Sequence, residues 1–253
     1  MLVLISSSKT MDFTRAQHPK THTIPVFIKE SEELISLLKD YSSDELMRLL
    51  KISKPIAETN FNRFRKWNSL SVEKSKIAFF AFKGDVYENI KAISLTASDC
   101  EFANLHLRVL SGLYGLLRPL DLIQPYRLGM DTKLKNTIGN DLYKFWKPKI
   151  TFELNKVIRE KNLKLILNLS SNEYYKAVDE KSLQMPVLSV VFKQKQLNTF
   201  KTLGLYSKKA RGQIINFIIK NRIVKPDEIK EFCEDDYRFN PLLSTEKEWV
   251  YTR

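Results

Sequence analysis

Short apolar runs separated by long amphipathic stretches constrain the fold of this 253-residue chain more than any other feature. Leu2–Ile5, Ile77–Phe82, Leu163–Leu169 and Val187–Phe192 are mainly apolar and are bounded by polar residues, which is typical of strands buried on both faces. Thr199–Tyr206 is expected to be a fifth strand. Strands that alternate with helices predict an α/β (mixed α+β) fold.

Amphipathic helices are expected between these strands. The expected helices are Glu32–Leu38, Asp44–Leu50, a helix with Pro55 in its first turn, a helix from Asp99 to Leu113, Asp141–Trp146, Phe152–Lys161 and Lys209–Lys220. Ser42 or Ser43 is the expected N-cap of the second helix, and Asp99 that of the fourth. Phe232–Tyr251 is expected to form a terminal hairpin. Since no repeat or Gly/Ser-rich linker divides the chain, residues 1–253 are expected to form one domain.

Positive charge is concentrated in one part of the chain. The formal net charge is +13, and residues 181–226 contain no Asp or Glu. Acidic residues return directly afterwards, at Asp227, Glu228, Glu231, Glu234, Asp235 and Asp236. We therefore expect a positive surface with a counter-charged border. Such a surface attracts anionic partners, with nucleic acid first, then nucleotides and anionic lipid.

Several site classes are not supported by the sequence. No apolar run reaches the roughly 20 residues of a membrane helix, and Met1–Ile5 lacks the features of a signal peptide. Cys100 and Cys233 stand far apart, which fits reduced thiols in the cytosol. His18 and His22 have helical metal-ligand spacing, but Pro19 between them disfavours a helix. We expect no membrane segment, no metal site and no cofactor.

Polar clusters follow the expected strands. They are Ser6–Thr10; Lys83, Asp85 and Tyr87; Asn168, Ser170, Asn172, Glu173 and Tyr174; and Tyr206, Lys208, Lys209 and Arg211. Further polar residues surround Gly112–Gly115 or follow it, namely Arg108, Arg118, Asp121, Tyr126, Arg127, Asp141 and Tyr143. Ligands of α/β sheets bind outside the carboxyl ends of strands, so one shared cleft is expected. The alternative is that these residues are strand-end caps and surface ion pairs.

The turn Gly112-Leu113-Tyr114-Gly115 allows two interpretations. A helix–hairpin–helix module would present its backbone N–H groups to DNA phosphates at such a turn. Its usual turn is apolar-Gly-apolar-Gly, however, and Pro119 limits a second helix. The other interpretation is a plain helix end.

Long motifs of this chain resemble those of the YaaA family. They are Phe82-Lys83-Gly84-Asp85-Val86-Tyr87, the segment from Arg108 to Asp121 with its continuation to Leu128, Gly139–Trp146, Asn168–Tyr174 and Tyr206–Gly212. The resemblance covers about residues 1–251. The family has SPAKT after its first strand, whereas this chain has Ser6-Ser7-Ser8-Lys9-Thr10. A rigid loop is therefore in doubt, but a cationic role for Lys9 is retained.

The resemblance implies a globular domain of unusual topology with a helix–hairpin–helix-like element. It also implies binding of double-stranded DNA with little sequence preference, a role in the response to peroxide, and lower free iron that limits oxidative damage to DNA. Our leading hypothesis is a cytosolic DNA-binding protein of the peroxide-stress response. The expected DNA-binding residues are Lys9, Lys83, Arg108, Gly112, Gly115, Arg118, Arg127, Lys208, Lys209 and Arg211.

The main alternative is an enzyme that acts on a nucleotide or nucleobase, because acidic residues repel phosphate and suit acid–base chemistry. Its candidate catalytic residues are Lys83, Asp85, Asp121, Asp141, Glu173 and Tyr174, and Tyr126 or Tyr143 are further candidates for stacking on a base. A deep enclosed pocket would favour the enzyme, and an open groove would favour DNA binding. Direct binding of iron by carboxylates is a third alternative.

Overall fold

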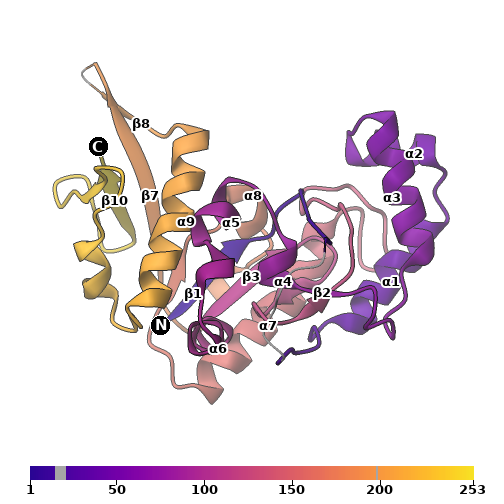
Figure 1. The fold of residues 1–253 in the computed structure, drawn as a ribbon, viewed down its shortest axis with the longest axis horizontal. Coiled ribbons are helices and arrows are strands. Elements are labelled where there is room, and N and C mark those ends of the chain that lie inside the picture. Colours follow the sequence, from indigo (N-terminus) through magenta and orange to yellow (C-terminus); the bar gives the residue numbers. More distant parts are fainter. Residues whose placement is uncertain (15–20, 198) are drawn as a thin grey trace.

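The computed structural model describes residues 1–14, 21–197 and 199–253, so His18 lies outside the described residues. Its main sheet runs in the order β4-β3-β1-β6-β7-β10-β9, with β8 paired to β7 (Figure 1). These strands are β1 (Leu2–Ser6), β3 (Leu107–Ser111), β4 (Gly115–Leu117), β6 (Ile166–Asn168), β7 (Val187–Gln196), β8 (Thr199–Lys201), β9 (Arg238–Phe239) and β10 (Glu248–Thr252). The mixed α/β class is confirmed.

The first strand lies in the interior of this sheet. β1 pairs in parallel with β3 on one side and with β6 on the other. Leu2, Val3, Leu4 and Ile5 have no exposed surface, because helices cover both faces of the sheet. This double coverage explains why the run is apolar throughout rather than alternating.

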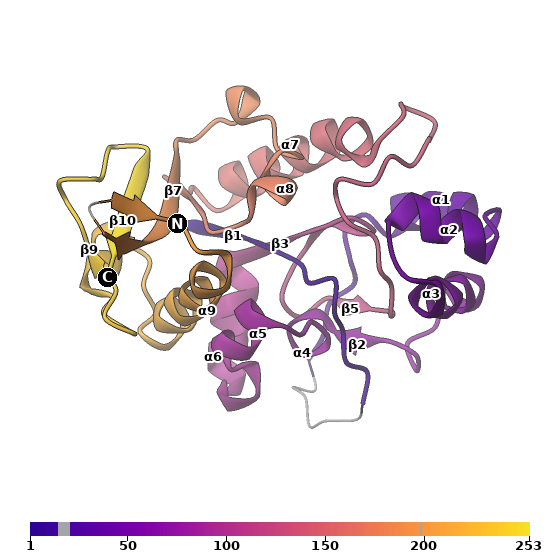
Figure 2. The ribbon, with the colours of Figure 1, turned by 90° about the horizontal axis from the view of Figure 1, so that it is seen from above.

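Helices lie on both faces because the chain crosses from β1 to β3 in one direction and on to β6 in the other. Right-handed crossovers in opposite directions place their helices on opposite faces. Accordingly α5 and α6, between β1 and β3, lie on one side, and α7 and α8, in the connections to β6 and β7, lie on the other (Figure 2). α9 packs against α5 on the first side, although the connection from β7 to β10 runs in the same direction across the sheet as that to β6. The bounds are α4 (Ala78–Ala81), α5 (Asp85–Ile90), α6 (Ala97–His106), α7 (Leu142–Glu160), α8 (Asn172–Tyr175) and α9 (Gly204–Lys220), with short 3-10 turns at Ala92–Ser94, Glu180–Ser182 and Pro226–Glu231. None of the helices that the structure describes is long and apolar enough to cross a membrane.

A helical lobe lies at one end of the molecule, opposite β9 and β10 (Figure 1). It consists of α1 (Ile28–Lys39), α2 (Ser43–Leu50) and α3 (Lys54–Lys66). The predicted cap of α2 is confirmed at Ser42, whose hydroxyl accepts from the Glu45 N–H at 3.3 Å while the Glu45 carboxylate accepts from the Ser42 N–H at 2.8 Å. Pro55 lies in the first turn of α3 as predicted.

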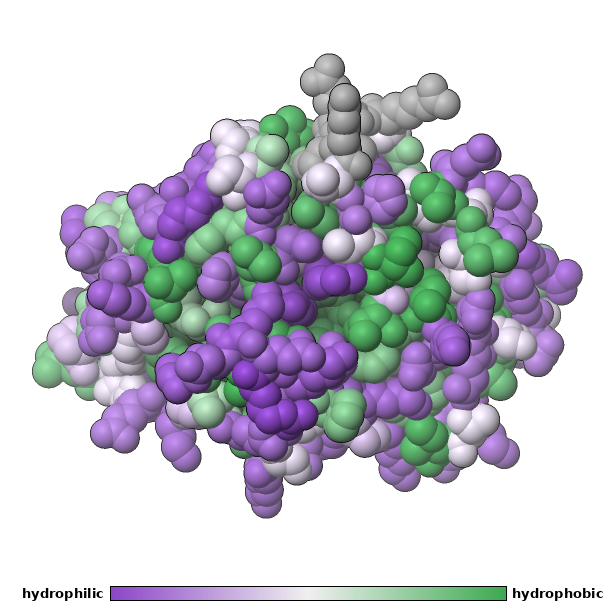
Figure 3. Space-filling view, turned by 90° about the horizontal axis from the view of Figure 1, so that it is seen from below, coloured by the Kyte–Doolittle hydropathy of each residue, from purple (hydrophilic) through white to green (hydrophobic). Residues whose placement is uncertain are grey.

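The surface seen from below the view of Figure 1 is largely hydrophilic (Figure 3). Hydrophobic side chains form several separate groups there. The described atoms of this face therefore do not form one large apolar patch of the kind that marks a protein interface.

The predicted strand Ile77–Phe82 is wrong over most of its length. Only β2 (Lys76–Ile77) is extended, and it pairs with β5 (Leu122–Ile123). Residues 78–81 form α4 instead. A short apolar run indicates burial but does not distinguish a strand from a buried helical turn.

The predicted helix from Asp99 to Leu113 is also wrong beyond His106. Residues 107–111 form β3 because they pair with β1, and this tertiary pairing overrides the helical spacing. The N-cap of α6 is Thr96, and Asp99 is the third residue of its capping box. Similarly, the predicted strand Thr199–Tyr206 ends at Lys201, and α9 begins at Gly204.

The Gly112–Gly115 turn joins β3 to β4, so both interpretations of this turn, a helix–hairpin–helix and a plain helix end, are wrong. A Cβ atom on Gly112 would meet the Leu128 carbonyl oxygen. Gly115 has a φ of +64°, and a Cβ there would lie 2.5 Å from the Trp146 ring. The indole N–H of Trp146 donates to the Gly112 carbonyl at 2.9 Å. The turn thus packs against the protein interior.

Gly115→Ala is expected to lower the free energy of unfolding by about 3 kcal/mol, because it combines a left-handed conformation with a clash against Trp146. Gly204→Ala is the control, because nothing lies within 4 Å of its added Cβ and it begins α9. It is expected to raise stability by about 0.5 kcal/mol. Urea unfolding of both variants measures the difference. Equal effects would contradict this role of the turn.

Asp99 ties α6 to the end of α9. Its carboxylate, with 7% of the side chain exposed, lies 2.8 Å from Lys220 Nζ and 2.7 Å from Arg222 Nη1. Burial alone would raise the pKa of Asp99, but hydrogen bonds from Lys220, Thr96 and Arg222 outweigh it and hold this pKa well below its usual range. The stabilisation is therefore present above the unfolded-state pKa and is lost as the pH falls through the folded-state pKa.

Asp99→Asn is expected to lower the free energy of unfolding at pH 7 by about 2 kcal/mol, since the amide keeps the cap but loses the charge. The difference from the parent protein should shrink below about pH 4, where the unfolded carboxyl becomes protonated. Urea unfolding between pH 7 and pH 2.5 tests this. Asp227→Asn is the control, because Asp227 is 81% exposed beside Lys230 and should change stability by less than about 0.5 kcal/mol. A pH-independent loss in Asp99→Asn would contradict the assignment.

Candidate functional site

A chamber of about 360 Å³ lies outside the carboxyl ends of β1 and β6. The loop Ser6–Thr10 after β1 and Leu169–Glu173 after β6 form one side, and the starts of α5 and α9 form the other. β1 is where the strand order reverses, since the chain turns to β3 on one side and to β6 on the other. Such switch points are where open α/β sheets bind ligands.

Hydroxyl groups hold the floor of this strand-end chamber together. The Ser171 N–H donates to Ser6 Oγ at 2.9 Å, and the Tyr87 hydroxyl donates to the Ser6 carbonyl at 2.9 Å. The Thr10 N–H donates to Ser8 Oγ at 3.1 Å. The hydroxyl of Ser8 thus shapes the loop from the position where the family motif has alanine, whereas Ser7 stands at the position of the motif's proline.

Each lysine of the chamber has a carboxylate neighbour. Lys83 lies 3.2 Å from Asp12, and Lys208 lies 3.9 Å from Asp85. Lys9 lies 3.0 Å from Glu173. These distances favour a role of the acidic residues in orienting the lysine ammonium groups.

Arg211 is the exception among the cations that line the strand-end chamber. No carboxylate of the described residues lies within ion-pairing distance of it, and its Nε atom is buried without a hydrogen-bond partner. Burial lowers the pKa of Arg211, although an arginine stays protonated at neutral pH. A partly buried cation without a counter-ion attracts an anionic ligand.

The remaining wall of the chamber is apolar and aromatic. Val86, Leu169 and the rings of Tyr87 and Tyr174 line it. Burial raises the pKa of Tyr174 and of Tyr87, with smaller contributions from neighbouring groups, so both phenols are neutral at pH 7. Both residues are more than nine-tenths buried, and they contribute no negative charge to the wall.

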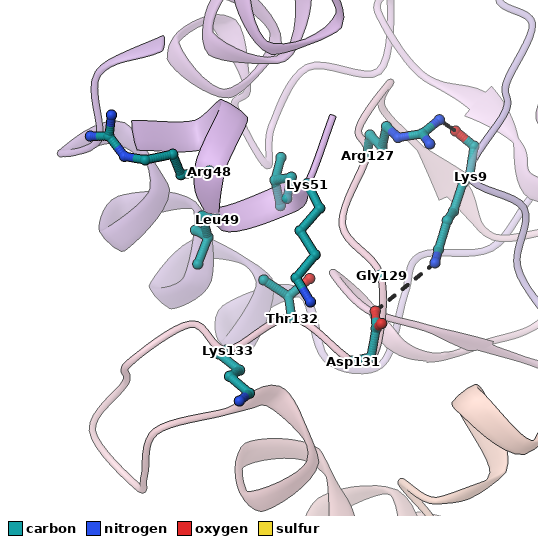
Figure 4. Close-up of a pocket in the computed structure, with 10 residues that line it drawn as sticks. Lys9, Arg48, Leu49, Lys51, Arg127, Gly129, Asp131, Thr132 and Lys133 are labelled. Carbon is teal, nitrogen blue, oxygen red and sulfur yellow. Dashed lines mark hydrogen bonds and ion pairs between the residues drawn. The ribbon is translucent and has the colours of Figure 1, made fainter. Parts of the chain in front are cut away.

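A second hollow, of about 380 Å³, lies between the end of α2 and residues 127–133 (Figure 4). Its cations are Lys9, Arg48, Lys51, Arg127 and Lys133, and its one carboxylate is Asp131. Lys51 extends from the end of α2 toward Thr132, whereas Arg48 points away from Lys51. No carboxylate of the residues that the structure describes is within 4.0 Å of the charged atoms of Arg48, Lys51 or Lys133. We call this the lobe hollow.

Lys9 connects the two hollows, because it lines both. Its ammonium lies 3.0 Å from Glu173 on the chamber side and 3.9 Å from Asp131 on the lobe side. Its carbonyl accepts a hydrogen bond from the Arg127 guanidinium at 3.1 Å. The lining of the two hollows is therefore continuous from α9 to the helical lobe, although the charge of Lys9 itself is balanced by these two carboxylates.

The structure brings only some of the expected site residues together. Lys9, Lys83, Asp85, Glu173, Tyr174, Lys208 and Arg211 line the chamber, and Arg127 lines the lobe hollow. Lys209 turns toward the C-terminal strands and lies 2.7 Å from Asp235, which is the counter-charged border expected from the sequence. Asp141 caps α7 by accepting from the Lys144 N–H at 2.8 Å. Tyr126 and Tyr143 hydrogen-bond to Ser111 and to the Glu173 carbonyl, respectively.

Arg108, Arg118 and Asp121 lie in a different cavity, of about 380 Å³, lined also by α7. Arg108 donates to the carbonyls of Asn104 and Leu107, and burial lowers its pKa to about 10. Arg118 lies 3.0 Å from Asp121, which is 1% exposed. Burial raises the pKa of Asp121 despite this ion pair. The cations expected to share one cleft are thus divided among three cavities, and Lys209 lines none of the three.

Arg48, Lys51 and Lys133 were not among the site residues expected from the sequence. A signal was present, since Leu50-Lys51-Ile52-Ser53 has the apolar-x-apolar-x pattern of a helix–hairpin–helix turn and joins two expected helices. Lys51 there has φ 53° and ψ 53°, a left-handed conformation that glycine normally adopts. Within the described ranges there is no group of three or more His, Cys, Asp or Glu side chains that could hold a metal ion.

Comparison with known proteins agrees with the motifs. A family described as peroxide stress protein YaaA matches residues 1–243. A UPF0246 protein of Hahella chejuensis is 42% identical over 254 residues, covering 100% of this chain and 99% of the relative. A UPF0246 protein of Acaryochloris marina is 43% identical and covers 100% of both chains. The chain belongs to the peroxide stress protein YaaA family.

Proposed function

We propose that this protein binds duplex DNA with little sequence preference during the cytosolic response to peroxide, and that it helps to limit iron-dependent damage to that DNA. The observation that supports this most directly is the lobe hollow, where Arg48, Lys51 and Lys133 lack carboxylate partners among the described residues. Cations on flexible stems neutralise phosphates without reading the bases.

The turn between α2 and α3 supports the same function. Lys51 places the chain in the left-handed conformation, and α3 begins three residues later at Lys54. The side chain of Ser53 makes no capping hydrogen bond and Pro55 has no N–H, so the N–H groups that the start of α3 offers to a ligand are those of Lys54 and Ile56. Two short helices that present free N–H groups at a turn can grip a phosphate of the DNA backbone.

The continuous surface from the lobe hollow to α9 is suited to a polyanion. It joins cations of the helical lobe to Lys9, Lys208 and Arg211 across the carboxyl ends of the strands. A single small anion would occupy one hollow only. A polymer with regularly spaced phosphates can occupy both, which favours DNA as the partner.

Lys51→Glu/Lys133→Glu is expected to weaken binding of a labelled duplex at least about tenfold at low salt. If both side chains contact phosphates, the slope of log K against log salt should become shallower by about 2. Anisotropy titrations between about 50 and 200 mM salt measure both quantities.

Lys164→Glu/Lys247→Glu is the matched control. It changes the net charge equally, but both residues precede strands, at the opposite ends from the chamber. It should leave the slope unchanged and weaken binding only slightly. Equal losses in both double variants would mean that net charge alone drives binding. The proposed function would be contradicted if the affinity of the parent protein for the duplex did not fall as the salt concentration rises.

A further inference from the structure

The strand-end chamber is too small for a duplex, whose major groove alone is about 12 Å wide. Its volume of about 360 Å³ lies at the lower end of the range of small-ligand cavities. We propose that the chamber receives one nucleotide unit, either a nucleotide turned out of an unpaired DNA site or a free nucleoside monophosphate. This inference rests on the proposed function, because the DNA-binding surface leads into the chamber.

The walls of the chamber match the two halves of a nucleotide. Val86, Leu169 and the buried rings of Tyr87 and Tyr174 form an apolar side for a base and its sugar. Lys83, Lys208 and Arg211 form a cationic side for the phosphate. A simple phosphate site would have no use for the apolar wall, and a site for an apolar molecule would have no use for the cations.

Arg211 is the group that most requires a ligand. Its guanidinium is partly buried, its Nε has no hydrogen-bond partner among the described residues, and no carboxylate of those residues lies within ion-pairing distance of it. Lys83 and Lys208, by contrast, each lie next to a carboxylate. Because Arg211 Nε is itself buried, a phosphate in the chamber would accept from the terminal nitrogens of the guanidinium, through a strong charge-assisted hydrogen bond.

Asp85 and Glu173 add hydrogen-bond acceptors to the chamber. Carboxylates repel phosphate, but they accept hydrogen bonds from the exocyclic amino groups of bases. Asp85 lies beside Lys208 and Glu173 beside Lys9, and acceptors at these points of the chamber favour a nucleotide with an amino-bearing base over an inorganic anion. Adenine, guanine and cytosine nucleotides are therefore the expected ligands, and thymine nucleotides are expected to bind more weakly.

Lys9 connects the lobe hollow to the chamber. Its ammonium lies between Asp131 of the lobe hollow and Glu173 of the chamber. A DNA strand bound along the lobe hollow can place an adjacent nucleotide past Lys9. Turning a base out of the stack costs least where the base is already unpaired. DNA with an unpaired nucleotide should therefore bind more tightly than a perfect duplex of the same length.

The first test uses a duplex with 2-aminopurine opposite an abasic site, beside the same duplex with 2-aminopurine paired to thymine. Eversion into the chamber should change the fluorescence of the unpaired probe upon binding and leave that of the paired probe nearly constant. Arg211→Met should abolish this change at protein concentrations that saturate the duplex, so that a general loss of affinity for DNA does not explain the result.

Lys209→Met is the matched control on the same helix. It removes the same charge, but Lys209 faces Asp235 and not the chamber. It should retain the fluorescence change. Circular dichroism and thermal unfolding establish that both variants are folded.

The second test distinguishes the two sources of the ligand. dAMP, dGMP, dCMP, dTMP and inorganic phosphate are each titrated into the parent protein and both variants by calorimetry at low salt. Saturable binding of dAMP that weakens about tenfold in Arg211→Met, but not in Lys209→Met, supports a nucleotide site. Binding of free dAMP without a 2-aminopurine response identifies the free nucleotide as the ligand, and the reverse identifies the everted one.

Different binding results would overturn the nucleotide site and the proposed DNA-binding function. Salt-sensitive binding of intact duplex, with neither a 2-aminopurine response nor saturable nucleotide binding, would overturn the nucleotide site and leave DNA binding standing. Saturable dAMP binding without any duplex binding would overturn the proposed function and leave the chamber a free-nucleotide site. Equal binding of phosphate and dAMP would show that the apolar wall has no role, which contradicts the inference.

Discussion

The pairing of β1 with β3 and β6 determines where the other parts of the molecule lie. β1 is flanked on both sides by parallel strands, and successive connections lead from it to β3 on one side and then to β6 on the other. The carboxyl end of β1 therefore lies at the switch point of the sheet. The loop Ser6–Thr10 emerges there and contributes Lys9 to both hollows. The apolar residues of β1 thus fix the position of a cation that they do not touch. A change in the register of β1 by one residue would turn its side chains over and move that loop.

The distribution of cations along α9 follows from helical geometry. Lys208 and Arg211 are three residues apart and lie on the face toward the chamber, whereas Lys209 is turned toward Asp235. Lys220 at the end of the helix pairs with Asp99 instead. The acid-free stretch is therefore not one uniform positive surface. One part faces an open chamber, and other parts bind carboxylates of neighbouring elements.

The sequence predicted the parts of the site that depend on local order and missed those that depend on tertiary contacts. Polar residues after β1 and β6 could be assigned to one edge because parallel strands bring their carboxyl ends together. Arg108 could not be placed, since it was expected on a helix and lies instead at the start of a strand, at the opposite end of the sheet. Lys51 was overlooked because the helix–hairpin–helix turn normally has glycine where this chain has lysine. Lys133 lies in a loop without any pattern, and only its packing beside α2 brings it to the lobe hollow.

The interior position of β1 also affects how the chain folds during synthesis. β1 leaves the ribosome about a hundred residues before β3 and about 160 before β6. At roughly 5–20 residues per second, Leu2–Ile5 waits on the order of ten seconds for its second partner. During that time a fully apolar strand has two unpaired edges, and contacts so distant in sequence form slowly. The interior strand that organises the finished protein is therefore the segment most exposed to aggregation before the protein is complete.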